Sequence, residues 1–364
     1  MLITDPALGR RGRVLLATLV LALSLLALPA GAASAAAGPV RVDTVCFSVH
    51  NTGDPLPSTL YGRRYTVGRP TASTPAIVLV HGIASSTANW DYTAGFSVAR
   101  RLAQAGFVVI SYDRLGFANS HYDRPKGGQL ITTPNQRDML HQLVGEVKTA
   151  GYTVARGADC SSPQTPSTLA SRTVVIAGHS AGAAIVQGYP GEFHDVAAMV
   201  QSNYSNRGQG PVVSQQIAQV VAPALASGAD YVPFFANRQQ CEQFDVFAPG
   251  AVPAVVNIAC DPTKFVLTPA GEFSGFPALE QENDQFVKST GSTPVLLVYG
   301  DHDAAFPPDL SQADYDYWVA NCAGCDITRY IEATSGHLFQ AHRVMPQWVD
   351  KVVSWLASRG IAPR

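Results

Sequence analysis

The chain has 364 residues, of which 46% are apolar and 14% are charged. This charged share is well below the roughly 25% of average globular domains, and it excludes a disordered chain, which is rich in charge and poor in residues to bury. Lys and Arg number 25 and Asp and Glu number 27. Without a positive surplus to neutralise phosphates, no nucleic-acid partner is expected. The length allows one large domain or two average ones.

The first residues have the pattern of a secretory signal peptide. Three arginines within residues 10–13 precede a mostly apolar run over residues 14–28, and small residues follow. With Ala33-Ser34-Ala35 as a cleavage pattern, this order predicts a signal peptide over residues 1–35 and a secreted, extracellular protein. The apolar run is shorter than the ~20 residues of a membrane span, so no stable span is expected. An uncleaved anchor is the alternative.

Export makes disulfides the expected state of the six cysteines. Six cysteines allow 15 pairings, and the sequence cannot choose among them. Local spacing favours Cys322 with Cys325 and Cys241 with Cys260, which leaves Cys46 with Cys160. Cys322-Ala-Gly-Cys325 could also be a redox motif, but it follows a helical stretch instead of opening a helix after a strand. No second Cys or His pair stands at zinc-ligand spacing, so no metal is expected.

The first half of the mature chain alternates strands and helices. Residues 59–68 have the pattern of a hairpin element, and residues 76–80 are apolar on both faces, as in a buried parallel strand. Apolar periodicity then predicts a helix over 95–105, followed by a strand over 107–112. A further helix is expected over 133–151, where Thr133-Pro134 begins a capping-box spacing.

The second half continues the alternation after a Ser- and Pro-rich loop over residues 157–172. A buried strand is expected over 173–177, and further strands over 196–200, 294–299 and 327–331, with a helix from residue 183 onward and another over 346–358. Apolar strands that alternate with helices predict an α/β fold, in which a doubly wound, mostly parallel sheet is covered on both faces.

Residues 206–290 interrupt this alternation. They contain many prolines and eight phenylalanines without a clean strand–helix order, and a structureless loop of that length is improbable in a compact domain. We therefore expect an inserted cap over 206–290, at the carboxyl edge of the sheet where ligands bind, and a core formed by 36–205 and 291–364. The phenylalanines would line an apolar substrate site or form the cap's own core.

Gly178-His179-Ser180-Ala181-Gly182 matches the pattern G-x-S-x-G between a predicted strand and a predicted helix. Such a turn strains the backbone of Ser180, and glycines two residues to either side avoid clashes with the strand and the helix. The turn lifts the hydroxyl above the sheet edge. It also directs the N–H groups of a helix that begins at Ala181 toward the oxygen that becomes negative. Ser180 is therefore predicted to be a nucleophile.

A serine nucleophile needs a base, and a histidine base needs an acid. Among nine histidines, His337 lies between the last strand and the last helix, at the carboxyl edge of the sheet; His342 is the alternative. Asp301 and Asp303 follow the strand over 294–299, and we prefer Asp303. The chain order of nucleophile, acid and histidine fits this reading.

On these motifs the chain resembles a secreted serine α/β-hydrolase of the esterase and lipase type, over roughly residues 59–358 apart from the cap. Gly300-Asp301-His302-Asp303 and Ser335-Gly336-His337 are similar to the family's acid and histidine loops. His81-Gly82-Ile83 resembles its oxyanion strand end, which implies an oxyanion hole made by the N–H groups of Ile83 and Ala181. The segment from Asp113 to Ser120 is similar to a D-x-x-G-x-G-x-S wall segment, with Ala118 in place of a glycine.

The resemblance implies an esterase that forms an acyl-enzyme, acts on a small-molecule ester of apolar character and uses no metal or organic cofactor. A serine peptidase or amidase is the alternative, and acyl transfer is a third reading. A peptidase would need a charged group in the cap to bind a peptide terminus; the candidates are Glu242, Asp245, Glu272, Glu280, Glu282 and Asp284. Asn203-Tyr204-Ser205 matches a glycosylation sequon. Acyl length and oligomeric state are not predicted.

Overall fold

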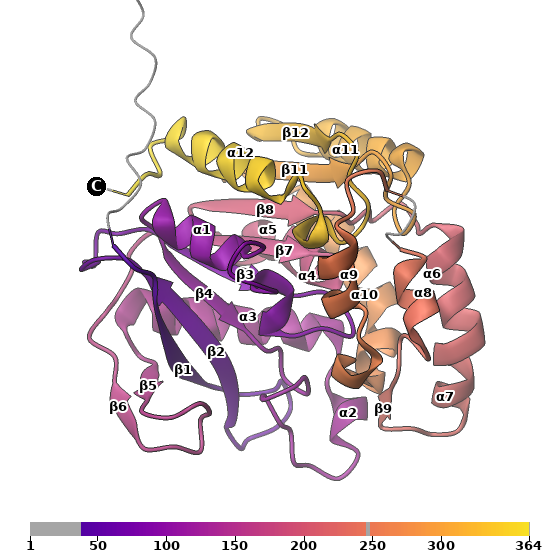
Figure 1. Ribbon diagram of the computed structural model, residues 1–364, viewed down its shortest axis with the longest axis horizontal. Coiled ribbons are helices and arrows are strands. Elements are labelled where there is room, and N and C mark those ends of the chain that lie inside the picture. Colours follow the sequence, from indigo (N-terminus) through magenta and orange to yellow (C-terminus); the bar gives the residue numbers. More distant parts are fainter. Residues whose placement is uncertain (1–37, 245–247, 364) are drawn as a thin grey trace, which may run out of the picture. The chain divides into compact units, whose positions relative to one another are not determined.

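A ten-stranded sheet runs through the computed structural model, which describes residues 38–244 and 248–363 (Figure 1). The predicted signal peptide lies outside these residues. The strand order is β12-β11-β8-β7-β3-β4-β2-β1-β5-β6. The strands are β1 Arg41–Val49, β2 Ser58–Thr66, β3 Ala76–Val80, β4 Val108–Tyr112, β5 Thr153–Ala155, β6 Gln164–Pro166, β7 Val174–His179, β8 Ala198–Ser202, β11 Val295–Gly300 and β12 Ile327–Glu332.

Six neighbouring strands, from β4 through β3, β7, β8 and β11 to β12, pair in parallel. Every residue of β3, β4, β7, β8 and β11 is buried, because helices cover both faces of a parallel sheet. The predicted α/β fold with a mostly parallel sheet is therefore confirmed. The predicted strands agree with the observed ones to within two residues, and β12, at the edge of the sheet, is only half-buried over most of its length.

Helices form a layer on each face of this sheet. One layer packs α1 (Val98–Gln104) and α12 (Met345–Ala357) against the sheet. The other contains α3 (Thr133–Thr149), α4 (Ala181–Gln187), α10 (Ala270–Val287) and α11 (Pro308–Asn321). The short remaining helices near the core are η1 Thr87–Trp90, α2 Gly127–Leu130, α5 Tyr189–Phe193 and η4 Phe339–Ala341. In the described part of the chain, no helix has both the length and the apolarity that a bilayer span requires.

The antiparallel edge of the sheet was partly missed by sequence analysis. The expected hairpin element over 59–68 corresponds to β2, whose antiparallel partner is β1, nine residues that we did not predict as a strand. The short strands β5 and β6 extend this edge, and β6 lies in the expected loop over 157–172. The structure pairs Cys46 with Cys160 at this edge, and Cys241 with Cys260 and Cys322 with Cys325 elsewhere.

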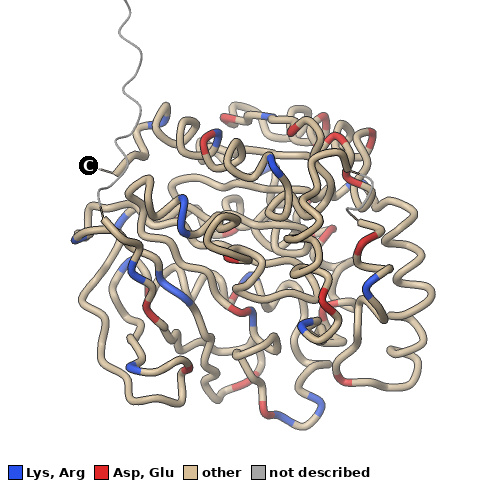
Figure 2. The backbone as a smooth tube through the Cα atoms, in the orientation of Figure 1, with Lys and Arg blue, Asp and Glu red and all other residues tan. Residues whose placement is uncertain are grey.

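Residues 206–290 are mostly helical and gather beside the carboxyl ends of the parallel strands (Figure 1). Their last helix, α10, packs against α2, α3, α4 and α5 of the core. Figure 2 shows acidic and basic residues interspersed along the described chain. The elements of 206–290 are α6 Pro211–Gln216, the π-helical turn η2 Ile217–Val221, α7 Ala222–Ala226, β9 Tyr231–Val232, α8 Arg238–Glu242, α9 Pro253–Ala259, η3 Pro262–Lys264, β10 Thr268–Pro269 and α10.

Glu332, the last residue of β12, has a buried carboxyl group whose ionisation should make folding stability depend on pH. Its side chain is 1% exposed, neither carboxylate oxygen has a hydrogen-bond partner among the described residues, and burial raises its pKa from 4.5 to about 8. The folded chain therefore keeps this proton longer than the unfolded chain does. Folding stability should fall as pH rises from about 4.5 to about 8.

We expect Glu332→Gln to remove this loss, because an amide does not ionise. Thermal unfolding should show the variant melting higher than the wild type at pH 8 by at least ~1–2 °C, the shift that about 1 kcal/mol produces in a chain of more than 300 residues. The difference should be small at pH 5. Asp350→Asn, at an exposed carboxylate on α12, serves as the control. Equal melting temperatures at pH 8 would contradict the account.

Candidate active site

Ser180 occupies a strained turn between β7 and α4. Its backbone has φ 55° and ψ −125°, a conformation that costs an ordinary residue of order 1–3 kcal/mol. The glycines on either side are required by close backbone contacts. A Cβ on Gly178 would collide with the carbonyl oxygen of Gly182, and a Cβ on Gly182 would collide with that of Val80. The hydroxyl is thereby held at the carboxyl edge of the sheet.

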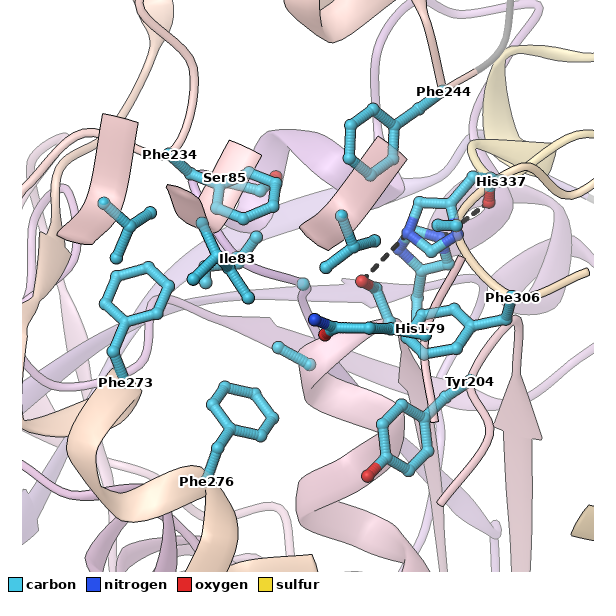
Figure 3. A pocket seen from close by; sticks show the side chains of 18 of the residues that line it. Ile83, Ser85, His179, Tyr204, Phe234, Phe244, Phe273, Phe276, Phe306 and His337 are labelled. Carbon is cyan, nitrogen blue, oxygen red and sulfur yellow. Dashed lines mark hydrogen bonds between the residues drawn. The ribbon is translucent and has the colours of Figure 1, made fainter. Parts of the chain in front are cut away.

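Three side chains from distant parts of the chain meet at this edge. The Nε2 atom of His337 lies 2.9 Å from Ser180 Oγ (dashed in Figure 3), and its Nδ1 atom lies 3.1 Å from Asp303 Oδ2. The side chains are nearly buried, since Ser180, His337 and Asp303 are 8%, 5% and 3% exposed. The Asp303 carboxylate accepts a hydrogen bond from the Nδ1–H group, which leaves the unprotonated Nε2 atom to accept a hydrogen bond from the serine hydroxyl.

The alternative acid and base lie elsewhere. Asp303 Oδ1 accepts the N–H groups of Ala305 and Phe306 at 2.8 and 3.0 Å, which orients the other oxygen toward His337. Asp301 instead accepts the N–H of Ser335 at 3.2 Å and contacts the ring of its neighbour His302. The Nδ1 atom of His342 accepts the N–H of Gly336 at 3.2 Å. The structure thus places Asp303 and His337 beside Ser180 and uses Asp301 and His342 to shape the adjoining loops.

Ile83 and Ala181 lie beside Ser180 in the wall of the same cavity. Ala181 is the first residue of α4, so the helix provides no acceptor for its N–H. Within residues 38–244 and 248–363, neither amide donates a hydrogen bond to a protein acceptor. The loop approaches the serine closely, since a Cβ on Gly82 would lie 3.0 Å from Ser180 Cβ. Both N–H groups are therefore available to a ligand oxygen.

Asn203 is a site residue that sequence analysis missed. It is buried directly after β8 with φ 52°. Its Nδ2 atom donates to the carbonyl oxygens of Gly336 and His337 at 2.9 and 2.7 Å, and its Oδ1 atom accepts the N–H of Gly300 at 3.1 Å. It thereby joins the acid loop to the histidine loop. With every polar atom occupied inside the fold, Asn203 cannot carry a glycan in the folded chain, so the sequon is not a modification site there.

His179 supports the same loop from the other side. One ring nitrogen lies 2.8 Å from the carbonyl oxygen of His337, and the other lies 3.3 Å from Asn89 Oδ1. Burial, together with the neighbouring His337, lowers the pKa of His179 well below its ordinary value. The ring is therefore neutral and positions the His337 backbone, a role that its place next to the nucleophile did not suggest.

A cavity of about 530 Å³ opens from Ser180 (Figure 3). Its walls are largely aromatic and aliphatic. Rings of Phe244 and Phe306 lie with their centroids 5.7 Å from that of His337. Of the phenylalanines expected in the cap, five line the cavity: Phe234, Phe235, Phe244, Phe273 and Phe276. Phe265 packs on Phe235, and residue 247 lies outside the described residues. The phenylalanines therefore line an apolar cavity and also pack against one another as the interior of residues 206–290.

Most of the acidic candidates for binding a peptide terminus have basic partners. Glu242, Glu272, Glu282 and Asp284 form ion pairs with Arg238, Arg114, Arg137 and Arg207. Glu280 lines the cavity but is exposed, and residue 245 lies outside the described residues. Among the described residues, no three His, Cys, Asp or Glu side chains gather in a way that could hold a metal ion.

Comparison with known proteins gives a family match and a set of similar folds. A model of the alpha/beta hydrolase family matches residues 77–352. A thermostable carboxyl esterase from Bacillus coagulans, solved with glycerol, is similar at 14% identity and a TM-score of 0.60, over 88% of this chain and 98% of that one. A search among curated proteins finds no match.

Two lipases give similar values. A soluble variant of monoglyceride lipase from Saccharomyces cerevisiae is 14% identical with a TM-score of 0.58, over 86% of this chain and 94% of that one. A monoacylglycerol lipase from Paleococcus ferrophilus is 16% identical with a TM-score of 0.56, over 82% and 99%. At these identities the likeness establishes the fold.

The contacts of His337 predict that Asp303 and Asp301 differ in importance. Asp303→Asn can present an amide N–H to Nδ1, which favours the tautomer with its proton on Nε2 and so removes the acceptor for the Ser180 hydroxyl. We expect labelling of Ser180 by a fluorophosphonate to slow by ~10³–10⁴, with thermal unfolding little changed. Asp301→Asn keeps an oxygen for the Ser335 N–H and should label almost normally. A larger loss in Asp301→Asn would reassign the acid.

Proposed function

The chain belongs to the alpha/beta hydrolase family, and we propose that it is a serine hydrolase that cleaves carboxylic esters through an acyl-enzyme intermediate. The observation that carries this proposal is the alignment of Asp303, His337 and Ser180 at 3.1 and 2.9 Å, at the mouth of an apolar cavity. The named activities of the similar esterase and lipases support ester cleavage.

In the proposed mechanism, Ser180 Oγ transfers its proton to His337 Nε2 as it attacks the ester carbonyl carbon. The N–H groups of Ile83 and Ala181 stabilise the resulting oxyanion, and each such donor contributes about 10²–10³ in rate. His337 then gives the proton to the departing alcohol, which leaves the acyl group on Ser180. A water molecule, deprotonated by His337, attacks the acyl group and releases the acid. Asp303 stays ionised and keeps the proton of His337 on Nδ1.

An ester is favoured over a peptide by the lining of the cavity. A peptide terminus would need a free charged group. Four of the acidic candidates are paired with arginines, which leaves Glu280 as the described candidate in a cavity wall that is otherwise mostly apolar. The aromatic and aliphatic walls suit an uncharged, apolar substrate, because each Å² of apolar surface that binding removes from water contributes about 25 cal/mol to the binding free energy.

We also propose that the protein is exported and acts outside the cell. The predicted signal peptide over 1–35 is the basis for this. Three disulfides within the described chain support it, because such bonds persist in oxidising compartments. In this proposal the mature enzyme consists of a core, 36–205 and 291–364, and a cap over 206–290, whose helices meet the core at the cavity.

The proposal is tested with p-nitrophenyl esters and aminoacyl p-nitroanilides. We expect the wild type to favour the esters, and Ser180→Ala to lower kcat by ~10⁶ without changing its circular dichroism or its unfolding temperature. Ordinary activity in Ser180→Ala would remove the serine from the mechanism. Faster turnover of anilides than of esters would establish the amidase alternative instead.

A further inference from the structure

One wall of the cavity is a continuous helical rod. The backbone stays in the right-handed helical region from α6 through η2 into α7, including the junctions at Gln216, Ile217 and Val221. Four aliphatic residues of this rod line the cavity at a spacing of four: Val213, Ile217, Val221 and Leu225. At a rise of 1.5 Å per residue, they extend over ~18 Å.

The π-helical turn keeps this aliphatic stripe straight. Four residues exceed one α-helical turn of 3.6 residues, so a stripe with this spacing would drift around an ordinary α-helix. The wider turn at Ile217–Val221 reduces this drift. It also lies just before Pro223, which has no N–H to donate and would otherwise disrupt the helix. The local irregularity thus has a sequence cause and a consequence for the shape of the cavity.

The rod begins near the reacting groups and leads away from them. The N–H of Gly210, just before the rod, donates to the carbonyl oxygen of Ala305 at 2.7 Å, and Ala305 is two residues from Asp303. Val213 is therefore the near end of the stripe and Leu225 is the far end. Figure 3 shows Phe273 and Phe276 across the cavity from His337, and these rings line the same apolar space.

We propose, on the basis of the proposed function, that this space is a channel for a long, unbranched acyl chain that lies along the stripe with its carbonyl at Ser180. An apolar channel suits the part of the substrate that stays bound through both half-reactions, and that part is the acyl group, since the alcohol leaves after the first. The substrates are then esters of long-chain fatty acids with small alcohols. Each methylene buried along the stripe raises kcat/KM by up to about fourfold.

The test uses p-nitrophenyl acetate, butyrate, octanoate, laurate and palmitate with one leaving group. We expect kcat/KM to rise at least as far as laurate. Leu225→Trp, at the far end, should shift the optimum to shorter chains and lower kcat/KM for palmitate more than kcat/KM for acetate. Ala218→Trp, at an exposed position of the same rod, is the matched control and should keep the wild-type optimum. Leu225→Ala should lower kcat/KM more for the longest esters than for acetate.

The outcomes separate this inference from the proposed function. Rapid acetate hydrolysis with a flat or falling chain-length profile, or an optimum that follows alcohol length in an alkyl acetate series, would overturn the acyl channel and leave the esterase intact. An optimum unmoved by both Leu225 variants would also overturn it. If no ester is cleaved and a fluorophosphonate does not label Ser180, the proposed function itself fails.

The peptide that joins Gly82 to Ile83 is held in place at its carbonyl oxygen by two side chains. The carbonyl oxygen of Gly82 accepts from Arg114 Nη2 at 3.2 Å and lies 2.7 Å from His81 Nδ1. The backbone N–H of Arg114 donates to His81 Nε2 at 3.0 Å, which places the ring proton on Nδ1. Burial, reinforced by the charge of Arg114, lowers the pKa of His81 well below its ordinary value, so the ring stays neutral and donates.

This arrangement fixes the direction of the Ile83 N–H. The described chain has no cis peptide bond, and in a trans peptide the N–H points opposite to the carbonyl. Holding the Gly82 carbonyl on one side therefore directs the Ile83 N–H toward the other. The guanidinium of Arg114 is itself held by a buried ion pair with Glu272 of α10, which also accepts from Gln136 Nε2 at 2.9 Å.

We infer that Arg114 is a positioning residue for the oxyanion hole, connected through Glu272 to the helix that carries Phe273. Arg114→Met leaves the buried charge of Glu272 unpaired and should lower the unfolding temperature. The double variant Arg114→Met/Glu272→Met replaces the pair by apolar side chains and should recover stability.

In the double variant we still expect kcat to fall by about 10–100-fold with KM unchanged, a part of the effect of losing one oxyanion donor. Inhibition by a trifluoromethyl ketone, which forms an oxyanion on the serine, should weaken by a similar factor. A stable double variant with wild-type kcat and inhibition would show that the pair is structural only and would overturn the inference.

Discussion

The contact between α4 and the strands beneath it leaves no room for side chains, and the rest of the site depends on this contact. Gly178 and Gly182 each face a backbone carbonyl that a Cβ would strike, so the helix can begin directly at the strand end. This forces Ser180 into its positive-φ turn and fixes the height of its hydroxyl above the sheet. Every other group must then be brought to that point, because the strained turn itself cannot move without opening the core.

The carboxyl edge of the parallel sheet brings these groups together. Successive strand ends provide His81 after β3, Arg114 after β4, Asn203 after β8 and the acid loop after β11. A buried polar network of this kind is stable only when its members are satisfied, and Asn203 shows how this is achieved, since one amide makes three hydrogen bonds to two loops. The geometry of the site is therefore a property of the sheet edge as a whole.

Local signals were sufficient to predict much of this architecture. Strands such as β3 and β4 are apolar on both faces, and the motif around Ser180 lies between a strand and a helix, so both the parallel sheet and the position of the hydroxyl could be inferred. β1 was missed because its polar first half, Arg41–Thr44, lacks a continuous apolar run. Asn203 and the pair between Arg114 and Glu272 belong to no periodic pattern. Their partners lie more than 90 residues away in the chain, so their roles depend on tertiary packing that local sequence does not encode.

The burial of Asn203 has a consequence for producing the protein. In a eukaryotic secretory pathway, oligosaccharide is transferred to Asn-X-Ser sequons on a nascent chain, before β8 has joined the sheet. A bulky sugar on this amide would occupy the space of the Gly336 and His337 carbonyls and would prevent the two loops from closing. Bacterial expression avoids this conflict, whereas secretion from yeast or insect cells would divide the product into an unglycosylated folded fraction and a glycosylated fraction that is retained or degraded.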